Sequence, residues 1–410
     1  MVINIIVNRV EQHKIKKYVF YWSLIDSLCF ESKNLYNYAN YLIRQEFISK
    51  QQILTYKEVL QICKNSEPYK NMGSNIGQET LRMLDKAWKS FLVSIKDWST
   101  SPSKYLGKPK LPKYKNKDGR FTSRLDNNKF KIIDGYIYFC WKKLKCMNNT
   151  FKTNIPSDSK LMQIRFVPQG SDYIMEVVYQ IEVPESLEIT SHIASIDLGI
   201  DNFATITNNI GLQPIVVKGG IIKSINQYYN KRKAEIQSEL KKVSNKDWSK
   251  KLQRLTTKRN NKVKNFMHIA SKRVVDYCVL YGIDTLVCGL NKTWKQESNM
   301  NKQNNQNFVS IPYDMFIKQL AYKCENNSIR FITTEESYTS GTSFLDGEEP
   351  CKENYNKSRR VHRGLFISNG GIKINADVNG SYQIMRKVFP DAFANGIEGV
   401  CLHPMTMKIA

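Results

Sequence analysis

Apolar residues recur three or four positions apart in several long segments of the chain, and this spacing predicts amphipathic α-helices. In residues 24–47, for example, Ile25, Leu28, Leu35 and Leu42 would all lie on one side of such a helix. The predicted helices cover residues 24–47, 56–63, 76–98, 221–281 with a break near Ser244, 312–322 and 381–388. The first three follow one another closely and predict a small helical lobe.

Other segments alternate between apolar and polar residues or hold short apolar runs, and these predict β-strands. Two of them flank Asp134-Gly135, a pair that favours a tight hairpin turn. The predicted strands in the first half of the chain indicate a small antiparallel barrel or sheet. We expect residues 2–7 to pair with it. The predicted strands cover residues 130–133, 136–139, 161–167, 173–181, 193–196, 203–207, 210–217, 285–287 and 329–333.

The length and charge of the chain limit the possible functions. Its 410 residues predict two or three domains, and a hydrophobic content of 41% is sufficient for packed cores. The 62 Lys and Arg residues outnumber the 37 Asp and Glu residues, so the net charge is +25 and a polyanion is the expected partner. We find no apolar run of about 20 residues and no signal-peptide pattern, so we expect a soluble, cytoplasmic protein that acts on nucleic acid and not on a membrane.

The cysteines and histidines do not form a recognisable metal or nucleophile motif. None of the nine cysteines stands in C-x-x-C spacing or near a histidine in a finger pattern, so we expect no zinc. Most of the cysteines lie within apolar segments and are predicted to be buried, reduced thiols. The five histidines are scattered singly, which gives no support to a Ser/His or Cys/His nucleophile.

Residues 104–124 form a basic strip, with eight Lys or Arg residues and one Asp. Pro109 and Pro112 prevent a helix, and aromatic residues are interleaved with the charges. An extended strip of this kind suits a phosphate backbone and unpaired bases, although a solvated surface loop is the alternative. The candidate phosphate-binding residues here are Lys108, Lys110, Lys113, Lys115 and Lys117.

Two further basic segments are candidates for contacts with nucleic acid. Lysines and arginines crowd the faces of the helices predicted in residues 221–281, and an arginine cluster follows residue 358. A solvated helix face would explain some of these charges, but their density favours a wall that guides nucleic acid. The candidates are Arg232, Arg259, Arg359, Arg360 and Arg363.

Four acidic residues stand at the ends of predicted elements. Asp197 ends an apolar run, Glu335 and Glu336 end another, and Asp377 precedes the last predicted helix. Metal-dependent cleavage of a phosphodiester needs three or four carboxylates around ions ~4 Å apart, and Mg²⁺, which prefers oxygen ligands, is the natural ion. We therefore predict a site for Mg²⁺, with two ions, at these acids. The alternative is that they are turn and surface residues.

Several motifs of the chain resemble the TnpB family, the RNA-guided DNA endonucleases of insertion sequences and ancestors of the type V CRISPR effectors. They include GKPKLPKYK, SIDLGIDNFATI, EESYTS, RRVHRGLF and NADVNGSYQIMRKV, in this order along the chain. The resemblance implies an α/β and α+β multidomain protein that binds a guide RNA from the transposon end and cleaves target DNA beside a short adjacent motif.

The resemblance also implies three domains. They are a helical recognition lobe, a small antiparallel wedge β-barrel and a RuvC domain of ribonuclease H fold, and the RuvC domain contains a target-nucleic-acid-binding insert. The expected boundaries are residues 1–22 and 100–187 for the wedge, 23–99 for the lobe, 188–338 and 371–410 for RuvC with a basic helical insertion at 221–281, and 339–370 for the insert.

The sequence departs from the family pattern at two places. The commoner members carry Glu-Asp-Leu-Asn after an apolar strand, whereas this chain has Cys288-Gly289-Leu290-Asn291. Taken strictly, this predicts a dead nuclease, but a branch of the family instead carries Glu-Glu-Ser-Tyr-Thr-Ser on the next strand, which could return a carboxylate to the site. Residues that alternate along a strand face opposite sides, so we expect only one of the two glutamates to bind metal.

The second departure is the zinc ribbon that many relatives hold in residues 339–374, where this chain has only Cys351. We therefore expect an insert held together without zinc. Three functions remain open from the sequence. The leading one is an active Mg²⁺-dependent, RNA-guided endodeoxyribonuclease; the alternatives are a nuclease-dead, RNA-guided DNA-binding repressor and, with less support, a transposase that joins DNA strands itself.

Overall fold

The computed structural model describes residues 4–184, 192–290, 310–362, 364–394 and 401–409. The chain divides into two compact units, one of residues 6–182 and one of residues 1–5 and 183–410. Both combine helices and strands, so the chain is a mixed α/β protein of more than one domain. The finer domain boundaries that the resemblance implies stay a prediction.

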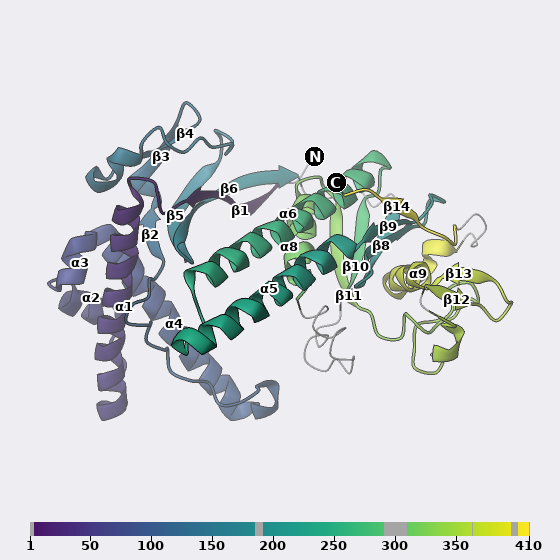
Figure 1. Cartoon of the computed structure of the whole chain (residues 1–410), viewed down its shortest axis with the longest axis horizontal. Helices are drawn as coiled ribbons and strands as arrows, with labels where there is room; N and C mark the ends of the chain where they lie inside the picture. The colour runs from purple at the N-terminus through teal and green to yellow at the C-terminus, as the bar shows by residue number, and fades with distance from the viewer. Residues whose placement is uncertain (1–3, 185–191, 291–309, 363, 395–400, 410) are drawn as a thin grey trace. The chain divides into compact units, whose positions relative to one another are not determined.

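The first unit contains helices over the three predicted segments, and the separate helical lobe expected from them stays a prediction. The apolar faces of α1 and α4 contribute Ile25, Leu28, Leu84 and Trp88 to a core that continues into the strands of the same unit. A capping box, in which Thr55 and Glu58 bond each other's backbone amides, begins α2. The four helices are α1 (Trp22–Lys50), α2 (Tyr56–Cys63), α3 (Glu67–Met72) and α4 (Ser74–Thr100), as Figure 1 shows.

The strands of the first unit form a four-stranded sheet and a separate hairpin. The sheet has the order β1-β6-β5-β2, so the N-terminal strand does pair with it, as predicted. The closed barrel implied by the resemblance is not established by this order and stays a prediction. Asp134 and Gly135 both have positive φ, which is the turn geometry that their pairing predicts. The strands are β1 (Asn4–Ile15), β2 (Ser123–Asp126), β5 (Lys160–Gln169) and β6 (Asp172–Pro184), with β3 (Phe130–Ile133) and β4 (Tyr136–Phe139) in the hairpin.

The second unit is built on a six-stranded sheet of order β11-β10-β7-β8-β9-β14. β8 runs antiparallel to both β7 and β9, whereas β10 runs parallel to both β7 and β11, and β14 runs parallel to β9. The strands are β7 (Ile193–Leu198), β8 (Asn202–Asn208), β9 (Ile215–Lys218), β10 (Thr285–Leu290), β11 (Arg330–Glu335) and β14 (Met405–Met407).

Helices cover both faces of this sheet, which explains why its central strands, from β9 to β10, are almost entirely buried. Ala194 and Ile196 of β7 pack in one core with α6 (Lys250–Leu280) and α8 (Tyr313–Glu325). Ile193, which alternates with them, packs against Ile384 of α9 (Ala376–Val388). Asp197 lies four residues after Ile193 and therefore on the same face of β7, so its carboxylate points toward the side of the sheet that α9 covers.

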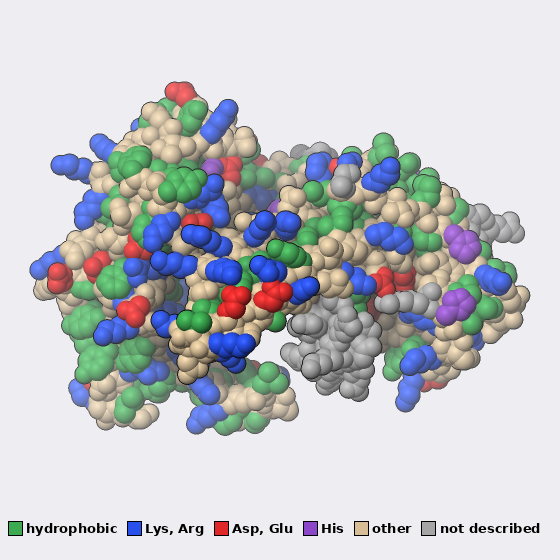
Figure 2. Space-filling view, in the orientation of Figure 1, with side chains coloured by type: hydrophobic (Ala, Val, Ile, Leu, Met, Phe, Trp, Pro, Cys, Tyr) green, Lys and Arg blue, Asp and Glu red, His purple; other side chains and the backbone are tan. Residues whose placement is uncertain are grey.

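A long helical hairpin leaves the sheet after β9. It consists of α5 (Gly220–Ser244) and α6, which lie side by side (Figure 1), and the predicted break near Ser244 is confirmed. Figure 2 shows Lys and Arg side chains gathered over this hairpin, with a few acidic ones among them. None of the helices in the part of the chain that the structure describes is long and apolar enough to span a membrane.

Candidate active site

Three of the four predicted acids line one cleft of about 580 Å³ in the second unit. Asp197 enters it from the end of β7, Glu336 from the residue after β11, and Asp377 from the first turn of α9. The remaining lining residues come from the end of β7, the start of β8 and the turn between them, from the end of β9 and from the 339–375 segment; they are Leu198, Gly199, Ile200, Asp201, Asn202, Lys218, Thr339, Ser340, Arg360, Gly364 and Asn375.

Asp197 is held in a position that disfavours its negative charge. Its loss of hydration is the largest cause, and the charges of Glu336 and Asp377 add to it, so the pKa of Asp197 lies well above its usual range. Arg360 offsets this only in part. A group of carboxylates that repel one another in this way is a typical environment for a bound cation.

The approach of α9 to Asp197 depends on small residues. A Cβ atom added at Gly380 would lie 3.0 Å from Oδ2 of Asp197, so a larger residue would displace the carboxylate by a few tenths of an ångström. Below this contact, the buried hydroxyls of Ser195, Thr207 and Ser381 bond one another at 2.8–3.2 Å. This network fixes α9 against β7 and β8, and with it the relative positions of Asp197 and Asp377.

Asp377 bonds three residues, a set of contacts that sequence patterns did not reveal. The side chain of Asn375 caps α9 and accepts hydrogen bonds from the backbone amides of Asp377 and Val378, which orients the first turn. Asn202 Nδ2 donates to Asp377 Oδ2 at 2.7 Å, and Arg360 Nη2 lies 3.1 Å from Oδ1. Arg360 was predicted as a phosphate contact; the structure places it inside the acidic cleft.

The two neighbouring glutamates have different surroundings. Glu336 lines the cleft, and its charge contributes to the raised pKa of Asp197. Glu335 instead accepts hydrogen bonds from Ser337 and from Lys387 Nζ at 3.1 Å. Burial alone would raise the pKa of Glu335, but these hydrogen bonds outweigh it and the pKa is lowered. Of the pair, only Glu336 shares the cleft with the two aspartates.

Gly289 lies where Glu336 needs space. It belongs to β10, in the motif where the commoner family members carry acidic residues. A Cβ atom at Gly289 would lie 3.1 Å from Oε2 of Glu336 and 2.5 Å from Cδ1 of Ile384. Because Gly289 has no side chain, β10 leaves room for Glu336, the glutamate that follows β11.

The cleft fits a hard cation by the chemistry of its donors, which are carboxylate and amide oxygens. Within the described ranges, however, no group of three or more His, Cys, Asp or Glu side chains is close enough to hold a metal ion as it stands. Arg360 and Asn202 engage both oxygens of Asp377 in this arrangement. Side-chain rotations would have to bring the three carboxylates together around an ion.

The basic strip of the first unit is an ordered segment. Asn37 bonds both backbone groups of Lys115, at 2.8 and 2.9 Å, and Asn40 Nδ2 donates to the carbonyl of Pro112 at 3.0 Å. Lys115 is directed inward, with Nζ 4.6 Å from the ring centroid of Tyr36. Four of the five candidates are exposed, namely Lys108, Lys110, Lys113 and Lys117.

The predicted arginines are mostly engaged within the protein. Arg259 donates to Asn226 and to the carbonyl of Ser310, Arg232 pairs with Glu235, and Arg359 pairs with Glu348 at 2.6 Å. These contacts favour structural roles for Arg259 and Arg359. Arg363 lies outside the described residues.

Comparison with known proteins gives two family matches, both after residue 175. Residues 176–295 match the model of the OrfB_IS605 family, described as a probable transposase, and residues 313–384 match the Cas12f1-like TNB domain. The first match contains Asp197, and the second contains Glu336 and Asp377. Each of the two matched segments therefore contributes at least one acid to the cleft.

One curated relative and several solved structures are similar over most of the chain. The TnpB-like protein ORF457 of Acidianus two-tailed virus is 23% identical over 399 residues, which cover 87% of this chain and 81% of the relative. A Cas12f1–sgRNA–target DNA complex is 14% identical, with a TM-score of 0.37, over 92% of this chain and 98% of that one. The mini-RNA-guided endonuclease CRISPR-Cas_phi3 is 9% identical, with a TM-score of 0.46, over 97% and 94%.

Proposed function

We propose that this chain, which is a TnpB-type protein, binds a guide RNA derived from a transposon end and cleaves target DNA beside a short adjacent motif. One observation carries the proposal: Asp197, Glu336 and Asp377, from three elements far apart in the sequence, line a single cleft of a chain with a net charge of +25. The acids suit metal-dependent hydrolysis, and the excess of basic residues suits RNA and DNA.

Asp197, Glu336 and Asp377 would hold Mg²⁺, with Asn202 beside them. Bound divalent ions supply a water molecule of lowered pKa and stabilise the charge of the leaving oxygen in phosphodiester hydrolysis. Arg360 has a further role in this proposal. If Asp377 bound an ion, the guanidinium group of Arg360 would lose this partner and would be free to bind a phosphate of the DNA strand through two parallel hydrogen bonds.

The topology of the second unit supports a RuvC-type domain in residues 188–338 and 371–410. Three antiparallel strands, β7, β8 and β9, are extended beyond β7 by the parallel strands β10 and β11. This order and these directions are those of the ribonuclease H fold, in which the first strand carries a catalytic aspartate at its end. Asp197 has this position in β7.

Residues 339–370 would form the insert that contacts target DNA, and the side chain of Glu348 supports a zinc-free construction. Its carboxylate accepts hydrogen bonds from the backbone amide of Ser343 at 2.8 Å, from Arg359 at 2.6 Å and from Asn369 at 3.3 Å. Its backbone carbonyl accepts from Gln383 of α9. One acidic residue thus cross-links segments that a metal ion would otherwise join.

The test is to purify the chain with co-expressed RNA, sequence that RNA, and incubate the complex with a plasmid library in which the flank of the target is randomised. We expect Mg²⁺-dependent cuts beside one short motif. The Asp197→Ala variant should bind the same RNA and DNA without cutting. If the wild-type complex binds its target but does not cut it at any Mg²⁺ concentration, the nuclease is ruled out and a nuclease-dead, RNA-guided repressor is the function that remains.

A further inference from the structure

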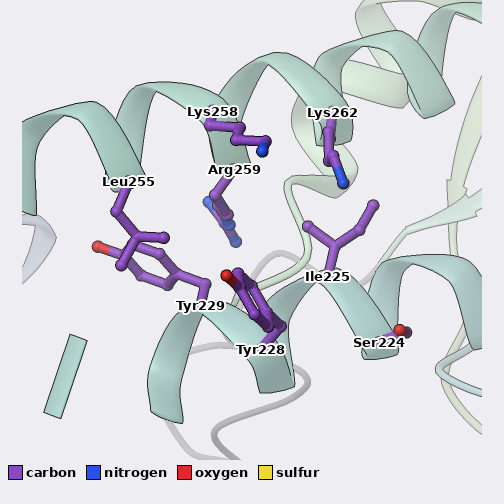
Figure 3. A pocket seen from close by; sticks show the side chains of 8 residues that line it. All are labelled: Ser224, Ile225, Tyr228, Tyr229, Leu255, Lys258, Arg259 and Lys262. Carbon is purple, nitrogen blue, oxygen red and sulfur yellow. The ribbon is translucent and has the colours of Figure 1, made fainter. Parts of the chain in front are cut away.

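The helical hairpin contains a small pocket away from the acids, with a volume of about 270 Å³. Figure 3 shows it from nearby, with side chains of α5 below and of α6 above. Ile225 and Tyr228 rise from α5, and Lys258, Arg259 and Lys262 extend toward them from α6. The pocket is lined by Ser224, Ile225, Tyr228, Tyr229, Leu255, Lys258, Arg259 and Lys262.

One wall of the pocket is held in place by hydrogen bonds. The hydroxyl of Tyr229 lies 3.1 Å from Oγ1 of Thr256 on α6. Arg259 donates to Asn226 at 2.8 Å and to the carbonyl of Ser310 at 2.6 Å, and its Cζ lies 5.8 Å from the ring centroid of Tyr229. Side chains that are already ordered lose little conformational entropy when a ligand binds.

The other side of the pocket presents an aromatic ring and two cations to solvent. Tyr228 is 62% exposed, and Lys258 and Lys262, one helical turn apart, are also exposed. None of the described residues that line the pocket carries a carboxylate, so none of them would repel a bound anion. Ile225 adds an apolar surface beside the ring of Tyr228.

We propose that this pocket binds one unpaired nucleotide, with its base stacked on Tyr228 and its phosphate between Lys258 and Lys262. Bases have an apolar, polarisable face that stacks on aromatic side chains, and the phosphate supplies the negative charge that two lysines attract. A duplex offers phosphates but covers the faces of its bases. Only an unpaired nucleotide therefore uses both the ring and the lysines.

The inference rests on the proposed function as far as the source of the nucleotide is concerned. Both a guide RNA with unpaired segments and a displaced DNA strand offer a base and a phosphate in this arrangement. The pocket itself depends on neither the metal site nor cleavage, so each of the two proposals can fail without the other.

The test uses the full chain and short, fluorescein-labelled probes that carry 5-iodouridine or 5-iododeoxyuridine, as single-stranded RNA, as single-stranded DNA and as duplex. Irradiation joins an iodinated base to an aromatic ring on which it is stacked, and mass spectrometry identifies the residue. We expect a crosslink to Tyr228 with a single-stranded probe and none with the duplex. The probe that gives the higher yield, RNA or DNA, identifies the source.

Variants separate stacking from charge. Tyr228→Ala should weaken single-strand binding about tenfold and leave duplex binding unchanged, while Tyr228→Phe should retain both. Lys258→Ala and Lys262→Ala should each reduce the slope of log affinity against log salt by about 0.7, whereas Lys131→Ala, an exposed control on β3 outside the helical hairpin, should not.

Crosslinks that map elsewhere, or equal single-strand affinities of Tyr228→Ala and the wild type, would overturn the pocket while leaving guided cleavage untouched. A crosslink at Tyr228 in a chain that never cuts DNA would support the pocket and refute the nuclease.

Discussion

Asp26 in the first unit and Asp197 in the second are both aspartates whose burial disfavours the charged carboxylate. Asp26 is compensated: Arg120 donates to its two oxygens at 3.0 and 2.8 Å, Tyr173 donates at 2.6 Å, and its pKa falls below the usual value. Asp197 faces Glu336 and Asp377 instead, and its pKa is raised.

The comparison shows how a structural carboxylate differs from one that is available for chemistry. The charge of Asp26 contributes to the stability of the fold because partners within the chain satisfy it. The charge of Asp197 opposes folding in the absence of a cation, because its nearest charged neighbours are mostly acids. Asp197 therefore has a capacity for binding a cation that Asp26 lacks.

The largest expected effect is on cleavage. Asp197→Asn removes a negative oxygen ligand while preserving shape, so the single-turnover rate should fall by more than about a hundredfold. The same assay with Asp26→Asn should give a rate close to that of the wild type at a temperature where both are folded. Comparable losses in the two variants would contradict the division of roles.

The next effect is on stability, and its sign should differ between the two aspartates. Asp26→Asn removes a charge bound by Arg120 and Tyr173, so the free energy of unfolding should fall by about 2 kcal/mol. Asp197→Asn removes a charge repelled by its neighbours, so the stability should remain or rise. Urea denaturation at neutral pH in the presence of EDTA measures both. A loss of stability in Asp197→Asn equal to that in Asp26→Asn would contradict this expectation.

A smaller effect is expected at Gly289. The Cβ of Gly289→Ala would press on Glu336 and Ile384, so we expect about 1 kcal/mol of destabilisation and a slower cleavage rate. Adding Ile384→Val removes the nearer clash, so the double variant should be no less stable than Ile384→Val alone. Its cleavage rate should remain reduced, because the contact with Glu336 persists. Wild-type cleavage by Gly289→Ala would show that the position of Glu336 tolerates displacement.

The smallest effect concerns Lys323, a cation of α8 that is not among the residues lining the acidic cleft. Burial lowers its pKa from 10.5 to about 8, although Nζ donates to the carbonyl of His268 and to Ser271. Between these pH values the unfolded chain binds more protons, so the stability of the wild type should rise with pH relative to Lys323→Met. Urea denaturation at several pH values tests this, and parallel curves for both proteins would contradict it.

The sequence predicted those features that depend on local patterns. Helical spacing located α1, α2 and α4, and Asp134-Gly135 located a hairpin. α3 was missed because its six residues are too few to show a period. α9 begins at Ala376, five residues before the helix predicted from apolar spacing, because the side chain of Asn375 caps it there.

The candidate site was predicted in part. Asp197 and Asp377 were identified from their places at the ends of elements, but alternation could not decide between Glu335 and Glu336, since both lie where β11 ends. The bond between Asn202 and Asp377 joins positions 175 residues apart and has no signature in a single sequence. The inward position of Arg360 likewise depends on tertiary structure, because its pattern is that of any surface arginine cluster.

Equilibrium binding of Mn²⁺, as a spectroscopic substitute for Mg²⁺, to the Glu336→Gln and Glu335→Gln variants tests the central claim most directly. The two substitutions are chemically identical and adjacent, so each is the control of the other. We predict that Glu335→Gln binds Mn²⁺ like the wild type and that Glu336→Gln binds it at least about tenfold more weakly. Equal affinities of the two variants, or a loss confined to Glu335→Gln, would contradict a metal site formed by Asp197, Glu336 and Asp377.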